Sequence, residues 1–387
     1  MNKPFLLAAA WAISLCPVAR AGESTPPTPI APKLQHYVDD RVMAGAVILV
    51  ADREKILEVE AFGYSDLKAQ TPMQADNLFW IASMTKSVTG AAFMILVDEG
   101  KVQLDDPVEK YIPAFKDLKV AQADGTLVPP SHPIRIREIL SHTGGMGFLN
   151  KKDRQIIDSA PLETSIENNL LEPLLYDPGT KWVYSNEGID TAGRIIEIVS
   201  GMPYEQFLQE RLFTPLGMVD TTFHPNSEQL KRLAKTYKVP KGETQLVETP
   251  IHFLTYPLDG PNRYPAPGGG LFSTVRDVVR FCQMLANGGT FEGKTYLSKN
   301  AVHEMTTKQT GPLVGNSYGL GINGSDGTVF GHTGAFKTKM EVDHGQIRVF
   351  LTQHASDWTS GDPYVDFATE AKRLYPPDQN GSPIQPQ

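Results

Sequence analysis

A serine and a lysine three residues apart could together form a nucleophile and the group that accepts its proton. Ser83 and Lys86 lie where an apolar run takes up helical spacing, and residues at i and i+3 share one helix face. The helix N-terminus would favour negative charge developing on the hydroxyl. An N-cap is the common role for a serine at such a place, and the same spacing recurs at Ser65 and Lys68 in a polar turn. The pair alone leaves both roles open.

A second stretch could supply what such a lysine lacks. In water a lysine stays protonated up to a pH of about 10.4, so the chemistry needs a neighbour that keeps the proton-accepting form in reach. Tyr184 and Asn186 lie on a predicted loop between a Pro-Gly turn and a helix, in PGTKWVYSNEG. A buried tyrosine there could share the proton, or it could simply be a packed aromatic residue.

A third stretch, His332-Thr333-Gly334, follows a predicted strand. An edge strand at this place could present side chains and backbone N–H groups to a substrate. An earlier copy, His142-Thr143-Gly144, follows a predicted helix and is expected to lie in a loop.

Together these stretches resemble those of the serine penicillin-recognising enzymes, which include class C β-lactamases, D-alanyl-D-alanine carboxypeptidases and family VIII esterases. The likeness covers about residues 33–355, and the three motifs fall in order on Ser83-x-x-Lys86, Tyr184-x-Asn186 and His332-Thr333-Gly334. This order sets aside the two other copies, because Ser65 lies in a predicted hairpin and His142 precedes the tyrosine. The resemblance implies a β-lactamase/transpeptidase-like fold and an acyl-enzyme mechanism.

The resemblance also implies a role for each residue. Ser83 would attack a carbonyl while Lys86 and Tyr184 share its proton, and either of the two could be the base. The backbone N–H groups of Ser83 and Ala335 would form the oxyanion hole. The residues implied in substrate binding are Asn186, His332, Thr333 and Gly334. No metal or cofactor is implied, and the nine histidines include no His-Glu-x-x-His.

Two features bear on the substrate. His332 stands where typical class C β-lactamases have lysine, and His-Thr-Gly instead resembles the motif of some D-peptide carboxypeptidases. We therefore expect a D-alanyl peptide or similar amide as substrate, with a short-chain ester as the alternative. A neutral histidine holds a carboxylate less firmly than lysine does, which disfavours efficient β-lactamase activity. Lys337 and Lys339 could attract an acidic substrate if they face the cleft, or they could lie on a solvated strand face.

Other functions have some support in the sequence. Residues 315–319 fit Gly-x-Ser-x-Gly, the nucleophile elbow of α/β-hydrolases, with Ser317 as nucleophile. That elbow needs a helix after it, whereas the segment that follows is glycine-rich and strand-like. The non-enzymatic alternative is a penicillin-binding fold kept as a sensor or binding module.

The elements that must position the motifs follow from hydrophobic periodicity. The runs GAVILV and KILEVEAFGY predict a hairpin, a helix from Ser83 is expected to end at Gly100, and strands are predicted in SYGLGI, TVFGHTG, KMEV and IRVFLTQH. A helical pattern lies between Tyr364 and Leu374. Strands at both ends and helices between them predict an α+β fold, with a mainly antiparallel sheet flanked by helices and an all-helical lobe inserted at about 84–255.

The ends of the chain and its composition indicate where the protein acts and which partners it could have. Residues 1–21 are typical of a signal peptide, residues 22–32 of a proline-rich tether and residues 376–387 of a disordered tail, which leaves 33–375 as one catalytic domain. We expect an exported, periplasmic or secreted protein without a membrane span after cleavage. Losing Lys3 and Arg20 would change the formal charge from −8 to −10, which disfavours nucleic acid as a partner and leaves a small molecule or peptide. Cys282, the one cysteine of the mature chain, is expected in the core. The oligomeric state is not indicated.

Overall fold

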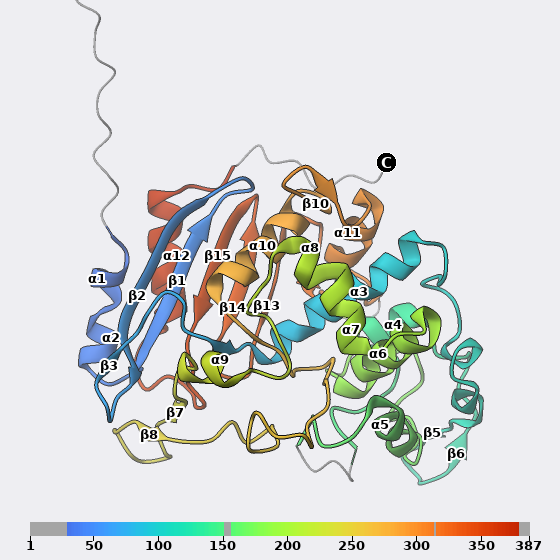
Figure 1. The fold of residues 1–387 in the computed structure, drawn as a ribbon. Helices are drawn as coiled ribbons and strands as arrows, with labels where there is room; N and C mark the ends of the chain where they lie inside the picture. The colour runs from blue at the N-terminus through green and yellow to red at the C-terminus, as the bar shows by residue number, and fades with distance from the viewer. Residues whose placement is uncertain (1–28, 151–155, 313–314, 379–387) are drawn as a thin grey trace, which may run out of the picture.

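Strands from both ends of the chain lie side by side in the computed structural model, which describes residues 29–150, 156–312 and 315–378 (Figure 1). The strand order is β12-β13-β14-β15-β1-β2-β3, and every pairing is antiparallel. Val47 of β1 pairs with Leu351 of β15, so the two ends of the chain meet inside the sheet. The predicted α+β fold is confirmed. The strands are β1 (Gly45–Ala51), β2 (Ile56–Asp66), β3 (Thr71–Pro72), β12 (Asn323–Gly324), β13 (Val329–Thr333), β14 (Lys339–Asp343) and β15 (Gln346–Leu351).

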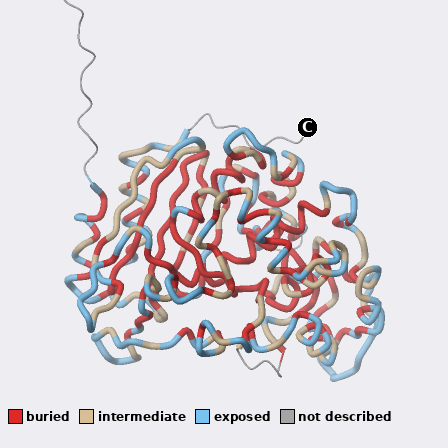
Figure 2. The backbone as a smooth tube through the Cα atoms, viewed as in Figure 1, coloured by how far each residue is buried: buried red, intermediate tan, exposed pale blue. Residues whose placement is uncertain are grey.

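Both faces of this sheet are covered, and β1 shows how the sequence allows this. Its Val47 and Leu49 enter the core that the sheet shares with α3 and α10, whereas Ile48 and Val50 enter the core on the opposite face. Successive strand residues point to opposite faces, so a strand covered on both sides needs an unbroken apolar run. Figure 2 shows the buried centre that results. The opposite face is covered by α1 (Ala31–Leu34), α2 (His36–Asp39) and α12 (Pro363–Leu374).

The ends of the chain are only partly described. The predicted signal peptide, residues 22–28 of the predicted tether and residues 379–387 of the predicted tail lie outside the described residues. Helix α1 begins at Ala31, inside the segment predicted as tether, because Ile30 and Ala31 are buried against the outer face of the sheet. Across the ranges given above, none of the helices combines the length and the apolar character needed to cross a bilayer.

Helices between the first hairpin and the last strands form a lobe beside the sheet (Figure 1). Helix α6 lies at its centre and packs against α3, α4, α5 and α7, while α11, from much later in the chain, packs against α3. Helix α10 instead packs on β1, β14 and β15. The helices are α3 (Thr85–Asp98), α4 (Ile136–Leu140), α5 (Leu162–Asn169), α6 (Asn186–Ser200), α7 (Tyr204–Leu208), α8 (Thr214–Leu216), α9 (Ser227–Lys231), α10 (Val275–Ala286) and α11 (Lys299–Thr306). The 3₁₀ turns are η1 (Ala82–Met84), η2 (Val108–Lys110) and η3 (Pro113–Asp117), and η4 (Gln209–Phe213) is a π-helical segment.

One predicted strand is wrong. The segment SYGLGI is irregular, and the strand that follows, β12, is only Asn323–Gly324. Its glycines serve close packing instead: a Cβ on Gly319 would lie 1.9 Å from the carbonyl oxygen of Met305, and one on Gly321 would lie 2.4 Å from that of Lys86. The segment is thereby held against α11 and α3. Short two-stranded pairs complete the fold: β4 (Phe79–Trp80) with β9 (Phe272–Ser273), β5 (Val120–Ala121) with β6 (Leu127–Val128), β7 (Tyr237–Lys238) with β8 (Val247–Glu248), and β10 (Thr290–Phe291) with β11 (Lys294–Thr295).

Candidate active site

Ser83 lies in a short 3₁₀ turn between a buried strand and a buried helix. The strand β4 is anchored by its pairing with β9, and α3 begins at Thr85, just after the turn. Ala82 has a φ of +48°, in the left-handed region that a side chain other than glycine rarely adopts. No side chain caps α3, and its N-cap position is Met84, so Ser83 does not have the capping role that the sequence left open.

Lys86 lies one helical turn further on and is fully buried, at 0% exposed. Its Nζ is 3.3 Å from Ser83 Oγ and 2.6 Å from Asn186 Oδ1, and it also donates to the carbonyl oxygen of Gly268. A neutral amine has two N–H donors and one lone pair. Because Asn186 and Gly268 take two donors, the lone pair of the neutral amine is left for the hydroxyl of Ser83.

Burial also decides the charge of this amine. It lowers the pKa of Lys86 to about 7, while the negative charge of Asp190 acts in the opposite direction. Asp190 lies four residues after Asn186 on α6, and its Oδ1 accepts the N–H of Gly268 at 3.0 Å. A large fraction of Lys86 is therefore neutral near pH 7.

Tyr184, from the second motif, lies beside both Ser83 and Lys86. Burial raises the pKa of its phenol well above 10, and a hydrogen bond with Ser83 lowers it by a smaller amount. The amine of Lys86 lies 4.6 Å from the centre of the tyrosine ring. The phenol therefore stays protonated at neutral pH and can donate a proton near Ser83.

Local structure explains why Tyr184 and Asn186 reach the same place. Ser185 is the N-cap of α6, since its Oγ accepts the N–H of Gly188 at 2.9 Å, so the chain turns sharply at this residue. Asn186 then begins the helix and is buried, with its Oδ1 on Lys86. Tyr184 and Asn186, on either side of the cap, therefore both lie against the amine of Lys86.

The third motif ends strand β13 beside the serine turn. Strand β12 pairs only with Phe330 and Gly331, which leaves the edge of β13 unpaired from His332 onward. Gly334 packs so closely on the serine turn that an added Cβ would lie 2.5 Å from the carbonyl oxygen of Ile81. The N–H of Gly334 donates to the carbonyl oxygen of Thr338, and the N–H of Lys337 donates to that of Gly334. These two bonds hold the turn without using the N–H of Ala335. This arrangement suits the oxyanion role predicted for Ser83 and Ala335.

His332 is held inside the protein, at 4% exposed. Its Nδ1 lies 2.9 Å from the carbonyl oxygen of Thr333 and its Nε2 lies 2.9 Å from the hydroxyl of Tyr318. Since a carbonyl only accepts, Nδ1 carries the proton and Nε2 accepts from Tyr318. Burial, and then the charge of Lys86, lower the pKa of His332 to about 3. The imidazole is therefore neutral, and both its nitrogens are occupied.

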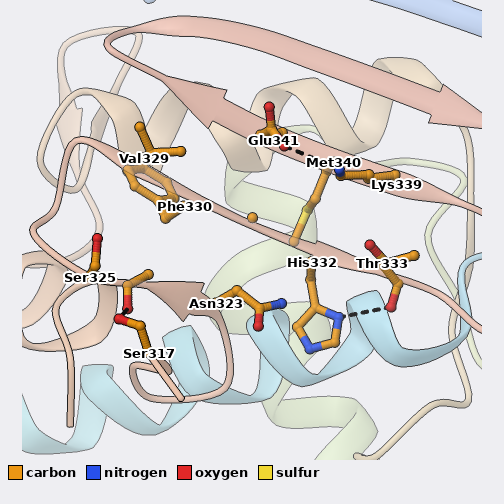
Figure 3. A pocket seen from close by; sticks show the side chains of 12 residues that line it. Ser317, Asn323, Ser325, Val329, Phe330, His332, Thr333, Lys339, Met340 and Glu341 are labelled. Atoms are coloured by element: carbon orange, nitrogen blue, oxygen red, sulfur yellow. Dashed lines mark hydrogen bonds and ion pairs between the residues drawn. The ribbon is translucent and has the colours of Figure 1, made fainter. Parts of the chain in front are cut away.

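A pocket of about 350 Å³ adjoins this motif along β13 (Figure 3). Figure 3 shows Thr333 and Lys339 at one end of it and Ser317 at the other, with His332 pointing toward the side where α3 lies. Thr333 and Ala335 are exposed, so the predicted binding strand is open to a ligand.

The lysines after the motif both have acidic partners. Lys337 lies 3.2 Å from Asp357, and Lys339 lies 3.2 Å from Glu341 and above the ring of Tyr364. Their charges are therefore partly neutralised, Lys337 in the turn between β13 and β14 and Lys339 at the start of β14, where it lines the pocket.

The rival serines lie in unsuitable surroundings. Ser65, in β2, donates to the carbonyl oxygens of Thr71 and Pro72. Ser317 is exposed and donates to the carbonyl oxygen of Gly324, and the next described element is the short strand β12 rather than a helix. The described residues also hold no group of three or more His, Cys, Asp or Glu side chains that could bind a metal ion.

Sequence reasoning missed three contributors to this site. Gly268 supplies a carbonyl oxygen to Lys86, and its place in the run GGG signalled a close approach: a Cβ there would lie 2.8 Å from Asn186 Oδ1. Asp190 could have been found from its i+4 spacing to Asn186. Phe148, 45% exposed, stacks on Tyr184 with ring centroids 6.2 Å apart, and no local pattern marked it.

Solved structures share this fold. EstCE1, a hydrolase with promiscuous acyltransferase activity, superposes with a TM-score of 0.71 at 24% identity, over 88% of this chain and 98% of that one. The octameric penicillin-binding protein homologue from Pyrococcus abyssi gives a TM-score of 0.69 at 22% identity, over 90% and 77% of the two chains.

Sequence comparison gives the family. Protein Rv1367c of Mycobacterium tuberculosis is 32% identical over 370 residues, covering 84% of this chain and 89% of that protein. Esterase EstB of Burkholderia gladioli is 29% identical over 276 residues, 65% and 68% of the two chains. A Salmonella typhimurium protein named provisionally as a D-alanyl-D-alanine carboxypeptidase is 27% identical over 364 residues, 80% and 79% of the two chains. The Beta-lactamase family model matches residues 30–364, and the chain therefore belongs to the Beta-lactamase family.

Proposed function

We propose that this protein is a serine hydrolase that forms an acyl-enzyme at Ser83, with the neutral amine of Lys86 as the base. The observation that carries the proposal is the arrangement of that amine: it is buried, its N–H groups are taken by Asn186 and Gly268, and Ser83 Oγ lies 3.3 Å away. Its pKa of about 7 suits a general base working near neutral pH. Tyr184, whose pKa is raised, is a poor base and a suitable proton donor.

The proposed reaction follows from these positions. Ser83 Oγ forms a bond to the substrate carbonyl carbon while its proton passes to Lys86. The carbonyl oxygen takes up negative charge, which the N–H groups of Ser83 and Ala335 stabilise, each at about 3 kcal/mol of barrier. The bond to the leaving group then breaks, and that group takes a proton from Tyr184, which Lys86 restores. Water attacks the acyl-enzyme in the same way and releases the acid.

From the sequence we expect a D-alanyl peptide first and a short-chain ester second. We reverse this order in the proposal, because the surroundings favour an uncharged ester. Phe148 offers an exposed apolar ring beside Tyr184, and His332 supplies no positive charge to a substrate carboxylate. Similarity to esterase EstB supports the same substrate class. A D-alanyl peptide is the second candidate, supported by the similarity to the Salmonella protein.

Intact-protein mass spectrometry tests the proposal. The wild-type protein should gain one acyl group from p-nitrophenyl acetate and lose it again as p-nitrophenol continues to accumulate. Ser83→Ala should gain none, whereas the matched control Ser317→Ala should behave as wild type. A stable adduct without turnover would favour the sensor alternative, and labelling lost with Ser317 instead of Ser83 would refute the assignment.

The same preparation can separate the two substrate classes. Nitrophenyl esters, D-alanyl-D-alanine peptides and a chromogenic cephalosporin should be compared at equal concentration. We expect the ester to turn over fastest. Faster release of D-alanine than of nitrophenol would reverse the order of the two candidates.

A further inference from the structure

The earlier copy of the third motif, which begins at His142, lies against the tyrosine of the second motif. His142 follows α4 and is 1% exposed. Its ring centroid is 4.5 Å from that of Tyr184 and 4.6 Å from that of Tyr318. Its φ of +64° lies in the left-handed region, where a histidine needs support from its surroundings.

His142 binds the chain on both sides of Tyr184. Its carbonyl oxygen accepts the N–H of Val183 at 3.1 Å, and its Nδ1 accepts the N–H of Ser185 at 3.2 Å. The hydroxyl of Tyr176 donates to the same carbonyl oxygen at 3.0 Å. A backbone N–H can only donate, so Nδ1 carries no proton. One residue thus holds both neighbours of Tyr184 while its ring packs on the tyrosine itself.

The chemistry of this ring distinguishes it from an aromatic filler. A phenylalanine could pack on Tyr184, but it would leave the buried N–H of Ser185 without its acceptor. Burial keeps the pKa of His142 well below its usual value, and the neighbouring Lys86 and His332 lower it further. The imidazole is therefore neutral and adds no positive charge beside the amine of Lys86.

We infer that His142 is a positioning residue for Tyr184, which it holds in place for proton transfer at Ser83 and Lys86. The inference rests on the proposed acyl-enzyme function. His142 does not touch the substrate; it acts through residues 183–185. A displacement of the phenol by about 1 Å could lower the rate about 100-fold.

Two substitutions of His142 test the hydrogen-bond acceptor for Ser185 separately from the packing of the imidazole ring. His142→Asn places a carbonyl oxygen near the position of Nδ1 and suits a left-handed backbone, whereas His142→Ala removes the acceptor. We expect His142→Ala to lower kcat for p-nitrophenyl acetate about 100-fold with KM nearly unchanged, and His142→Asn to restore most of it. His36→Asn, an exposed histidine on α2, is the matched control and should behave as wild type. Circular dichroism melting shows whether each variant is folded.

A double-mutant cycle keeps the inference falsifiable if His142→Ala is unstable. In a Tyr184→Phe background, His142→Asn and His142→Ala should differ little in kcat, because the group that His142 positions is already gone. Equal kcat for wild type and folded His142→Ala, or equal losses in both backgrounds, would overturn the inference and leave the acyl-enzyme proposal intact. Absence of any acyl adduct on Ser83 of the wild-type protein would overturn both the acyl-enzyme proposal and the inference about His142.

Discussion

The charge of Asp190 sets how much of Lys86 is neutral at a given pH, and replacing Asp190 with asparagine isolates this effect. Asp190 Oδ1 accepts the N–H of Gly268, while the carbonyl oxygen of Gly268 accepts from Lys86. The carboxylate raises the pKa of Lys86, against the larger effect of burial. Asparagine offers the same acceptor oxygen without the charge, so Asp190→Asn can keep the hydrogen bond.

The size of the effect follows from the separation of the two charges. Asp190 binds the N–H of Gly268 and Lys86 binds its carbonyl oxygen. If the charges bridged in this way are taken as about 8 Å apart, they interact by about 2 kcal/mol at an effective dielectric constant of about 20. About 1.4 kcal/mol corresponds to one pKa unit, and Asp190 is partly exposed and therefore screened. We expect Asp190→Asn to lower the pKa of Lys86 by about one unit.

The assay is the pH dependence of kcat/KM for an uncharged nitrophenyl ester. A lysine that must lose its proton to act gives a rate that rises with pH through its pKa, so the wild-type limb should lie near pH 7. A lower pKa makes the amine neutral at lower pH, so the limb of Asp190→Asn should move to lower pH. Asp117→Asn, at an exposed aspartate of η3, should leave the limb in place. A limb that stays unchanged or moves upward in Asp190→Asn would refute Lys86 as the base.

Three further predictions concern single side chains. Phe148→Ala should lower kcat/KM about tenfold for long-chain nitrophenyl esters and little for the acetate, as a chain-length series would show; equal losses would argue against an acyl contact. Asp158→Ala should lower the free energy of unfolding by about 3–5 kcal/mol in urea denaturation, because it leaves the buried guanidinium of Arg263 unpaired; a change below about 1 kcal/mol would contradict this. Cys282 should resist a disulfide reagent until the protein unfolds, since burial raises the pKa of its thiol to about 12; rapid labelling of folded protein would contradict this.

The sequence predicted the elements that depend on local pattern. The apolar run of β1 and the turn after it predicted the first hairpin, which the structure contains. The helix after Ser83 ends as expected, with Gly100 in a left-handed conformation at a φ of +70°. These predictions succeed because apolar strand runs and helix termination are decided by neighbouring residues.

The sequence could not predict contacts that form only when distant segments pack. Ser83, Lys86, Tyr184 and Asn186 were grouped through a family resemblance, and the structure brings these four together. The carbonyl of Gly268 reaches Lys86 from 182 positions away. The glycine run signals a close approach there, but no residue type signals which backbone carbonyl will accept a hydrogen bond. SYGLGI has the composition of a strand, yet its glycines are used for close packing against helices. His142 was set aside because it precedes the tyrosine in the sequence. Motif order, however, carries no information about which copy packs beside that tyrosine.

The pairing of β1 with β15 makes the sheet depend on a strand that is synthesised much later than β1. The serine turn leaves the ribosome long before β13 is synthesised, so Ser83 lacks the third motif during most of translation. Closing a loop of this length is entropically costly and comes late in folding. A chain cut short before β15 would also leave the long apolar strand β1 without a neighbour on one side. Activity in this protein would therefore report that synthesis has passed β15.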